Sequence, residues 1–302
     1  MEQLNSTVVI SNISSSPGYP SPASWDFRSL APAVVLSLSF LLGVPGNIAV
    51  IILRPNWQQM SRLSQILMLN LAISDLISLL PLPLWIYTLL CSWTLGLVLC
   101  KLLAYLAYCS LYSSQMTVTA LSVQRYLKVV YLQRYFHHVG LKKLLALLWL
   151  AAMILSIHAL VHQQLTPDQN WTRCRTGYSS PAQQEAVLLT QTLMGFLCCF
   201  VMAFSYIGLH RKVNQAAFFN NPQTTRLITS IIVSFNVLWM PNNITSALGV
   251  AAISLKNEGL LKFYMDSKNT AGALVFVNSC LNPLLYAFAF RSQCTVCQRG
   301  EH

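Results

Sequence analysis

Long apolar runs alternate with short polar segments along the chain. A helix of about 20 apolar residues crosses the roughly 30 Å hydrocarbon core of a bilayer. Seven runs fit this pattern: residues 30–53, 65–90, 102–123, 144–161, 186–209, 227–255 and 269–290. Because backbone polar groups in lipid must be satisfied within their own segment, the pattern predicts an all-α integral membrane protein with a seven-transmembrane helix bundle.

Basic residues in the polar segments predict the orientation. One side of the predicted bundle carries twelve of them: Arg54, Arg62, Arg125, Lys128, Arg134, Lys142, Lys143, Arg211, Lys212, Arg226, Arg291 and Arg299. The other side carries seven: Arg28, Lys101, Arg173, Arg175, Lys256, Lys262 and Lys268. Since the richer side faces the cytoplasm, we expect an extracellular N-terminus and a cytoplasmic C-terminus.

Glycosylation sequons agree with this orientation. The Asn-x-Ser/Thr triplets at Asn5, Asn12 and Asn170 fall on the predicted outer side, which is where such sites are modified. We therefore expect an extracellular glycosylated tail over residues 1–29, a transmembrane domain over 30–290 and a short cytoplasmic tail over 291–302.

Composition excludes several other classes of protein. Charged residues make up 9% of the chain, whereas a soluble domain carries about a quarter. The net charge is +11, but the basic residues form short clusters between apolar runs, so we expect no nucleic-acid partner. The sequence has no nucleophile–base pair, phosphate-binding glycine loop or paired carboxylates. We therefore expect that the protein is not an enzyme.

Asp75 is the only Asp, Glu, Lys or Arg within the seven runs. A carboxylate inside a membrane is costly and usually faces the bundle interior, where it marks a functional site. Ser114, Asn278 and Asn282 on other helices supply the oxygen ligands that a hard cation requires. We predict an allosteric sodium site there, with no other metal or cofactor; the alternative is a hydrogen-bonded Asp75 that only joins helices.

Two prolines predict bends in the last two helices. Pro241 and Pro283 each remove a backbone hydrogen bond and clash with the preceding turn. Trp239 and Tyr286 place aromatic groups beside these bends. This arrangement favours hinges, although membrane helices also tolerate proline without such a role.

Cysteine and histidine positions add further expectations. Cys100 and Cys174 lie in outward segments, where oxidation is permitted, and a bridge would join the third helix to the long loop after the fourth. Cys294 and Cys297 lie just inside the membrane, where lipidation competes with unmodified thiols. His162, four residues after His158, has too few companion ligands for a metal, so we expect it to line a pocket or form hydrogen bonds.

The chain resembles a rhodopsin-like (class A) G-protein-coupled receptor over essentially its whole length. The signatures follow one another along the sequence: Gly46-Asn47, Leu69-Asn70-Leu71-Ala72 with Asp75, Cys100, Gln124-Arg125-Tyr126, Trp149, Tyr206, Trp239-Met240-Pro241 and Asn282-Pro283-Leu284-Leu285-Tyr286. Within that family it is most similar to the leukotriene B4 receptors. The segments that carry this similarity are residues 42–47, 93–96, 121–125, 149–152 and 278–283.

The resemblance implies a plasma-membrane receptor that promotes nucleotide exchange on a heterotrimeric G protein, of the inhibitory class. Gln124, Arg125 and Tyr126 would engage the G protein. The activation switch would comprise Asp75, Ser114, Asn278, Asn282, Trp239, Pro241, Tyr206 and Tyr286. Gln124 stands where most relatives carry Asp, so the restraint on Arg125 is weaker and we predict raised basal activity.

The resemblance also implies a leukotriene B4-like ligand, a fatty acid with one carboxylate and an apolar chain. Lys268 and Arg175 would attract the carboxylate, and Tyr105, Tyr108 and Tyr112 share one helix face that suits the chain. His162, Gln163, Gln191 and Trp239 complete the predicted ligand site. The alternatives are ordinary packing for the tyrosines and a solvated cation for Lys268.

Several positions depart from the leukotriene receptor pattern. Gln163 replaces the family's Arg in the fourth helix, and Gln191 replaces a Glu in the fifth. His158 stands in place of a Pro, and Gln115 in place of a small aliphatic residue in the inner core. The missing Arg weakens the leukotriene assignment, because two cations hold a carboxylate better than one.

Other functional classes would predict different sequence features. A peptide chemoattractant receptor of the same family would favour an acidic outer mouth, which the outward cations oppose. A transporter or channel would show inverted repeats and several midplane ionisable groups, whereas Asp75 is alone. A retinal protein would need a Lys where the chain has Phe276.

Overall fold

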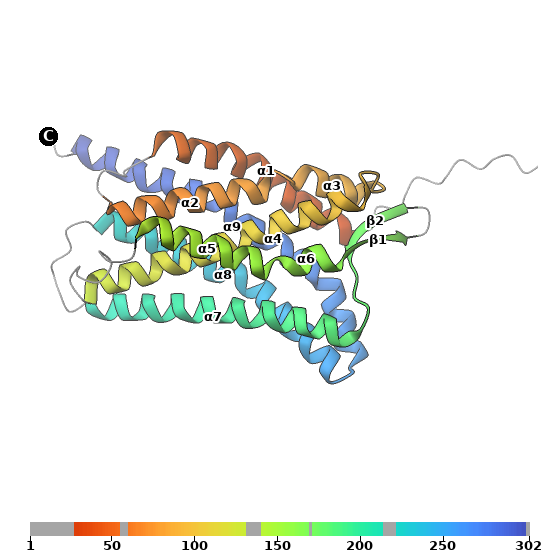
Figure 1. Cartoon of the computed structure of the whole chain (residues 1–302). Coiled ribbons are helices and arrows are strands. Elements are labelled where there is room, and N and C mark those ends of the chain that lie inside the picture. The colour runs from red at the N-terminus through yellow and green to blue at the C-terminus, as the bar shows by residue number, and fades with distance from the viewer. Residues whose placement is uncertain (1–26, 55–59, 131–139, 169–170, 214–221, 300–302) are drawn as a thin grey trace, which may run out of the picture.

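The computed structural model describes residues 27–54, 60–130, 140–168, 171–213 and 222–299. Its helices run roughly side by side in one bundle (Figure 1). The elements in order are α1 (Phe27–Leu53), α2 (Arg62–Leu79), α3 (Leu82–Leu90), α4 (Gly96–Val130), α5 (Leu141–Leu155), α6 (Ile157–His162), β1 (Gln163–Asp168), β2 (Trp171–Thr176), α7 (Pro181–Val213), α8 (Pro222–Ser254) and α9 (Glu258–Arg299).

All seven predicted spans are helical. Among the described residues, six helical segments are long and apolar enough to cross a membrane: Leu30–Leu53, Arg62–Thr88, Gly96–Lys128, Leu141–His162, Pro181–Leu209 and Leu227–Ser254. The seventh predicted span, 269–290, lies within α9, whose side chains are described as far as Leu285. The predicted helical bundle is therefore confirmed.

Two spans are interrupted, which the apolar pattern does not reveal. The second span divides into α2 and α3 at Leu80 and Pro81, because proline lacks the N–H that would continue the helix. The fourth divides into α5 and α6 at Ser156. The Ser156 hydroxyl donates to the Ala152 carbonyl at 2.7 Å, and such back-bonding is a known cause of helix bending.

The segment after the fourth span is a β-hairpin, whereas the sequence analysis predicted only a long loop. β1 and β2 pair antiparallel, with Leu165 opposite Cys174. The backbone of β2 also bonds to the segment after α3, where the Trp93 N–H donates to the Thr172 carbonyl at 2.7 Å. The hairpin lies at one end of the bundle, opposite the end of α9 (Figure 1).

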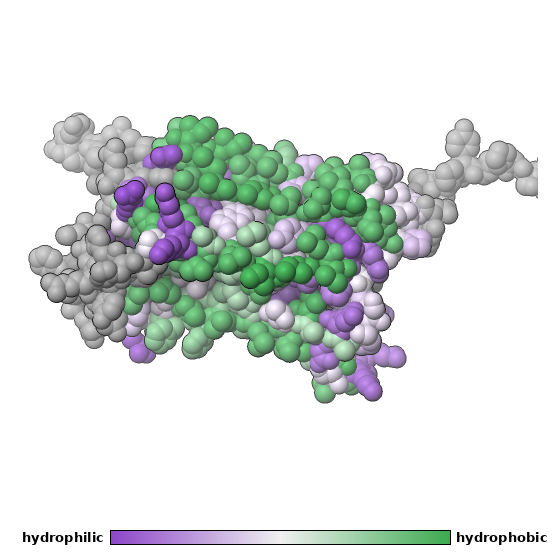
Figure 2. All heavy atoms as spheres, in the orientation of Figure 1, coloured by the Kyte–Doolittle hydropathy of each residue, from purple (hydrophilic) through white to green (hydrophobic). Residues whose placement is uncertain are grey.

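The bundle has an apolar outer surface and a partly polar interior. Figure 2 shows hydrophobic side chains over most of the visible middle of the molecule and hydrophilic ones towards its ends. Leu53 and Phe200 are 73% and 70% exposed, whereas Asp75 and Gln115 are fully buried. This distribution is expected where lipid, rather than water, surrounds the middle of a protein.

α4 is the central helix of the bundle. It contacts α2, α5, α6, α7, α8 and β1. The largest buried apolar cluster includes Val118 and Leu121 of α4, Met202 of α7 and Phe235 of α8. Side chains on α4 can therefore connect the outer end, the middle and the cytoplasmic end of the bundle.

Candidate functional site

Asp75 lies at the centre of a buried hydrogen-bond network between α2, α4 and α9. Its Oδ1 accepts from the Ser114 hydroxyl at 2.8 Å and from the Ser279 hydroxyl at 3.0 Å. Its Oδ2 accepts from the Asn282 amide at 2.7 Å. All four side chains are at most 2% exposed. Of the predicted cation site, Ser114 and Asn282 thus contact the Asp75 carboxylate directly.

Asn278, the remaining predicted member of the cation site, forms no hydrogen bond to the Asp75 carboxylate in the described structure. The Oδ1 atoms of Asn278 and Asn282 are buried and have no hydrogen-bond partner among the described residues. Oxygen ligands of this kind suit a hard cation. The sequence analysis missed Ser279, which directly follows Asn278, and named Asn47 only as a family signature. The Asn47 amide donates to the Ser279 carbonyl at 2.9 Å.

At the cytoplasmic end of α4, Gln124 precedes Arg125 and forms hydrogen bonds to the start of α2. The Gln124 amide nitrogen donates to the Ser61 hydroxyl at 2.9 Å, and its oxygen accepts from the Ser64 hydroxyl at 3.2 Å. Ser61 is also the N-cap of α2. Nε and Nη2 of Arg125 are buried without a hydrogen-bond partner among the described residues. Gln124 therefore joins α4 to the start of α2. It forms no hydrogen bond to Nε or Nη2 of Arg125.

The other predicted switch residues lie on α7, α8 and α9, and Tyr126 of the predicted G-protein site lies on α4. Trp239 is buried and stacks on Phe235 with ring centroids 5.2 Å apart. Pro241 lies inside α8, two residues after Trp239. Tyr126 contacts Phe204 of α7 edge-on, with centroids 6.0 Å apart, and Tyr206 is half-buried on α7. The side chain of Tyr286 lies outside the described residues.

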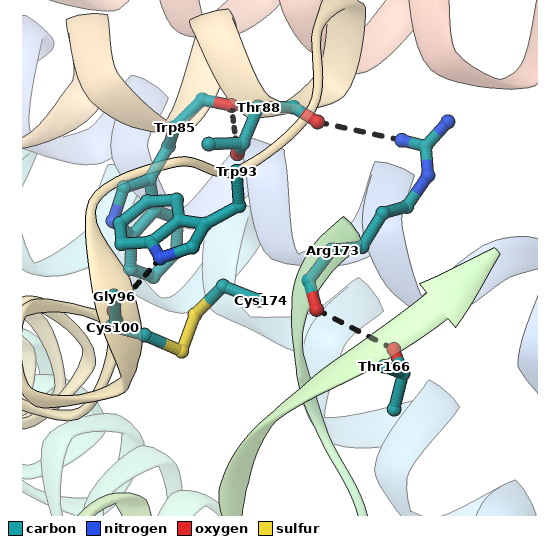
Figure 3. Close-up of a disulfide and its surroundings, with 8 residues drawn as sticks. All are labelled: Trp85, Thr88, Trp93, Gly96, Cys100, Thr166, Arg173 and Cys174. Carbon is teal, nitrogen blue, oxygen red and sulfur yellow. Dashed lines mark hydrogen bonds between the residues drawn. A yellow bond between two sulfur atoms is a disulfide. The ribbon is translucent and has the colours of Figure 1, made fainter. Parts of the chain in front are cut away.

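A disulfide closes the hairpin end of the bundle, as predicted. Cys100 of α4 is bonded to Cys174 of β2, with Cα atoms 5.8 Å apart (Figure 3). On one side of this bond the Trp93 indole donates to the Gly96 carbonyl at 2.8 Å, and on the other the Arg173 guanidinium reaches the Thr88 carbonyl at 3.4 Å. The hairpin is thereby fixed across the outer ends of α3 and α4.

Four tyrosines gather beneath the hairpin. Tyr108 and Tyr112 of α4 stack with centroids 6.4 Å apart. Tyr178, which follows β2, and Tyr264 of α9 both lie near Tyr108. Burial, and then the nearby Tyr108, raises the pKa of Tyr178, so its phenol stays protonated. We call Tyr108, Tyr112, Tyr178 and Tyr264 the tyrosine cluster.

Two of the three tyrosines predicted to line the ligand site belong to this cluster. Tyr108 and Tyr112 are members, and Tyr105, also on α4, is half-buried. The sequence analysis missed Tyr178 and Tyr264. The spacing offered a signal, because Tyr264 lies one helical turn before Lys268 and Tyr178 lies four residues after Cys174.

The predicted cations lie beside this cluster. The Lys268 ammonium is 5.7 Å from the centre of the Tyr264 ring and lies 3.4 Å from the Met265 sulfur. Lys268 is outside the predicted span, and burial, followed by the charge of Arg175, lowers its pKa. The positive charges of Lys268 and Arg175 therefore lie close enough to act on each other.

Polar side chains of the fourth and fifth spans complete the outer site. His158 Nδ1 donates to the Leu155 carbonyl at 2.8 Å, so its Nε2, 3.2 Å from the Gln191 amide, is an acceptor. The His158 ring lies edge-on to Tyr108 at 4.6 Å. His162 lies 5.0 Å from Tyr178. Gln163 is buried at the start of β1, and its Oε1 has no partner among the described residues.

Some predictions concern residues outside this description. The glycosylation sites Asn5, Asn12 and Asn170 lie in segments that the structure does not describe. Cys294 and Cys297 are within α9, but their side chains are not described. Among the described residues, no group of three or more His, Cys, Asp or Glu is arranged to hold a metal ion.

Comparison with known proteins identifies a family. Residues 46–286 match the family described as "7 transmembrane receptor (rhodopsin family)". Apelin receptor B of Danio rerio is 31% identical, over 88% of this chain and 82% of its own length. Leukotriene B4 receptor 1 of Homo sapiens is 30% identical, over 87% of this chain and 78% of its own. C-C chemokine receptor type 8 of Macaca mulatta is 27% identical, over 85% of this chain and 74% of its own length.

Proposed function

This chain belongs to the rhodopsin family of seven-transmembrane receptors, and we propose that its extracellular ligand is a carboxylate lipid of the leukotriene type. The family is one of G-protein-coupled receptors rather than enzymes, and its members are multi-pass proteins of the plasma membrane. Membership of the family does not determine the type of ligand, because the similar receptors are named for apelin, a leukotriene and C-C chemokines.

The placement of Lys268 carries the proposal. Its ammonium lies against Tyr264 in the tyrosine cluster and close enough to Arg175 for their charges to interact. A carboxylate bound there would pair with Lys268, and charge-assisted hydrogen bonds are about twice as strong as neutral ones. The aromatic faces of Tyr108 and Tyr112 would then contact the apolar chain.

Hydroxyl groups on the ligand have complementary partners. The Gln163 oxygen is a buried acceptor, and Gln191 and His158 form a polar pair beside Tyr108. Buried acceptors of this kind favour ligands that donate hydrogen bonds, because leaving such a group unpaired is costly. A hydroxylated fatty acid meets this requirement better than a plain hydrocarbon chain.

On the cytoplasmic side, we propose coupling to a heterotrimeric G protein of the inhibitory class through Arg125 and Tyr126. Agonist binding would change the bends at Pro241 and Pro283 and so the position of α8 relative to α4. A ligand shifts such an equilibrium only by its difference in affinity for the two states. A sodium ion at Asp75 would favour one of them.

A peptide chemoattractant is the second candidate ligand. The similarity to the apelin and C-C chemokine receptors favours it. The outward cations Arg173, Arg175 and Lys268 would then select an acidic peptide segment rather than a basic one. A peptide would also be expected to contact the hairpin more extensively than a lipid.

The test is a G-protein activation assay with a panel of oxidised fatty acids on the wild type and Lys268→Ala. Lys262→Ala is the matched control, because Lys262 is an exposed cation on the same helix. We expect a carboxylate lipid to activate the wild type and Lys262→Ala, and to lose about tenfold or more in potency on Lys268→Ala. Equal potency on all three proteins would exclude Lys268 as the anchor.

A further inference from the structure

An apolar groove on the bundle is lined by residues of α2, α4, α5 and α7. Its volume is about 410 Å³, within the roughly 300–1,000 Å³ range of small-molecule sites. Leu197 of α7, on its wall, is 59% exposed, and a side chain exposed at this depth contacts lipid rather than water. The residues of the tyrosine cluster do not line it, so the groove is separate from the outer ligand site.

Basic side chains border the cytoplasmic end of this groove. Leu63 of α2 and Leu144 of α5 line it, and each directly follows an exposed cation at the start of its helix, Arg62 or Lys143. Gly140 lies four residues before Leu144 and so shares its side of the chain. A Cβ on Gly140 would lie 3.8 Å from Cγ of Lys143. The stem of Lys143 therefore lies beside the face of α5 that lines the groove.

The picture of the surface agrees with this placement. Hydrophilic side chains gather where α2 and α5 begin, directly next to the hydrophobic middle of the bundle (Figures 1 and 2). An occupant of the groove that reached the cytoplasmic surface would therefore pass from an apolar wall to a positively charged rim.

The cytoplasmic segments supply no acidic side chain to neutralise these cations. Residues 54–64, 124–143 and 210–226 contain ten Lys and Arg and no Asp or Glu. The outer segments, by contrast, carry Asp and Glu among their basic residues. Membrane orientation depends on Lys and Arg, whereas Asp and Glu contribute little to it. Orientation therefore explains the excess of cations but not the missing acids, and an external anion fits both observations.

The groove and its rim together select the occupant. A protein partner at the cytoplasmic surface could neutralise the cations, but it would leave a groove that opens to lipid unfilled. A lipid with a neutral headgroup could fill the groove but would leave the cations without an anion. Basic pockets between membrane helices on the cytoplasmic side suit anionic headgroups. Along α4 the lining extends from Met116 to Val123, about 10 Å at 1.5 Å per residue, which is a depth that part of an acyl chain can occupy.

We propose that this groove binds one anionic phospholipid of the cytoplasmic leaflet. One acyl chain lies along the apolar wall, and the headgroup pairs with Arg62 and Lys143. Each Lys or Arg near an anionic lipid surface strengthens binding by about fivefold. The site goes beyond the ligand and the G-protein coupling proposed above and depends on neither of them.

The test counts bound lipid. The full chain, purified in detergent, is titrated with phosphatidylserine or with phosphatidylcholine of the same acyl chains, and bound lipid is measured by native mass spectrometry. We expect one phosphatidylserine to bind saturably and about tenfold more tightly than phosphatidylcholine. Glycerophosphoserine, the same headgroup without acyl chains, should displace it at least about tenfold less effectively, because it buries no apolar surface in the groove. Equal affinities for the two lipids, or equal displacement by the headgroup alone, would overturn the proposal.

Three charge variants assign the preference to the rim of the groove. Lys143→Ala should lower the affinity for phosphatidylserine about fivefold, and adding Arg62→Ala should lower it about fivefold further. Lys142→Ala is the matched control, because this exposed lysine lies two residues before Leu144, about 200° away around the helix axis. It should change the affinity less than about twofold. Equal losses in Lys142→Ala and Lys143→Ala would show a diffuse attraction and overturn the site.

A fourth variant tests the apolar wall. Leu197→Trp adds bulk at an exposed position of the groove, so the fold should tolerate it while the space for an acyl chain becomes smaller. We expect weaker binding of both lipids, with the preference for phosphatidylserine retained. Unchanged affinity for phosphatidylserine in Leu197→Trp would contradict the placement of the chain in this groove.

Discussion

Two glutamines on α4 are both buried in the bundle, yet their surroundings differ. Gln124 uses both ends of its amide, donating to Ser61 and accepting from Ser64. Gln115 is fully buried, and neither its Nε2 nor its Oε1 has a hydrogen-bond partner among the described residues. One helix thus carries the same polar group in a satisfied and an unsatisfied environment.

The difference separates two regions of the receptor. Around Gln124 and Asp75, polar side chains bond to one another between helices, and such networks fix helices in place. Around Gln115 the neighbours one turn away on α4, Leu111 and Val118, belong to or pack on the largest apolar cluster. An unpaired amide there is costly in this conformation. We interpret the Asp75 and Gln124 regions as fixed joints and the Gln115 region as the less stable, adaptable part of the core.

The largest effect is expected where the satisfied network is removed. In Asp75→Leu the donors of Ser114, Ser279 and Asn282 lose their acceptor, at about 1–3 kcal/mol for each orphaned group. We expect a loss of at least about 3 kcal/mol of stability, seen as a lower melting temperature of the detergent-purified protein. Asp75→Asn keeps an oxygen acceptor, so its melting temperature should lie between those of the wild type and Asp75→Leu. An Asp75→Leu variant as stable as the wild type would show that this hydrogen-bond network does not hold the helices together.

The sodium site can be tested in the same experiment. If sodium binds Asp75, replacing sodium by choline should lower the melting temperature of the wild type and leave that of Asp75→Asn and Asp75→Leu unchanged. Mass action makes this shift grow with the sodium concentration. An equal response in all three proteins would exclude Asp75 as the ligand.

Gln115→Met should stabilise the protein, whereas Asp75→Leu should destabilise it. The side chains have similar volume, and the change removes two unpaired polar atoms from an apolar cluster, so we expect a gain of about 1–3 kcal/mol. The measurement is again the melting temperature. Destabilisation would show that Gln115 bonds to an ordered water, in which case the contrast between the two regions would disappear.

Gln124→Met is the matched change in the satisfied environment. It leaves the hydroxyls of Ser61 and Ser64 without their amide partner, and we expect a loss of about 1 kcal/mol, less than for a fully enclosed group because Gln124 lies near the cytoplasmic surface. Opposite signs for the two Gln→Met changes on one helix would establish the contrast. The same sign for both would refute it.

The contrast between these regions also explains which features the sequence predicted. Apolar run lengths predicted all seven spans, because the hydrocarbon thickness fixes the length of a helix whatever surrounds it. Asp75 with Ser114 and Asn282 was predictable because a carboxylate in a membrane requires partners. The break at Ser156 and the hairpin after α6 were not. The first involves a bond from the Ser156 hydroxyl to the helix backbone and the second involves backbone pairing between strands, and neither leaves a mark on the apolar pattern.

The outer site was harder to predict than the inner network. Tyr178 and Tyr264 reach the tyrosine cluster from a loop and from the start of α9, and the helix-face argument considered only α4. Periodicity identifies residues on one face of a helix, but which neighbours meet that face is decided by tertiary packing.

The smallest expected effect concerns signalling from the cytoplasmic end of α4. Gln124→Asp introduces a carboxylate next to Arg125, whose Nε and Nη2 have no partner among the described residues. An ion pair at this partly accessible position contributes on the order of 1 kcal/mol, which corresponds to about a fivefold change in the equilibrium between inactive and active forms. We expect ligand-free G-protein activation to fall by about that factor at equal surface expression. Gln124→Asn, which adds no charge, is the control for shortening the side chain and losing the contacts to Ser61 and Ser64. If both variants lower basal activity equally, the amide contacts rather than the missing charge set the basal level; if neither does, Gln124 does not control Arg125.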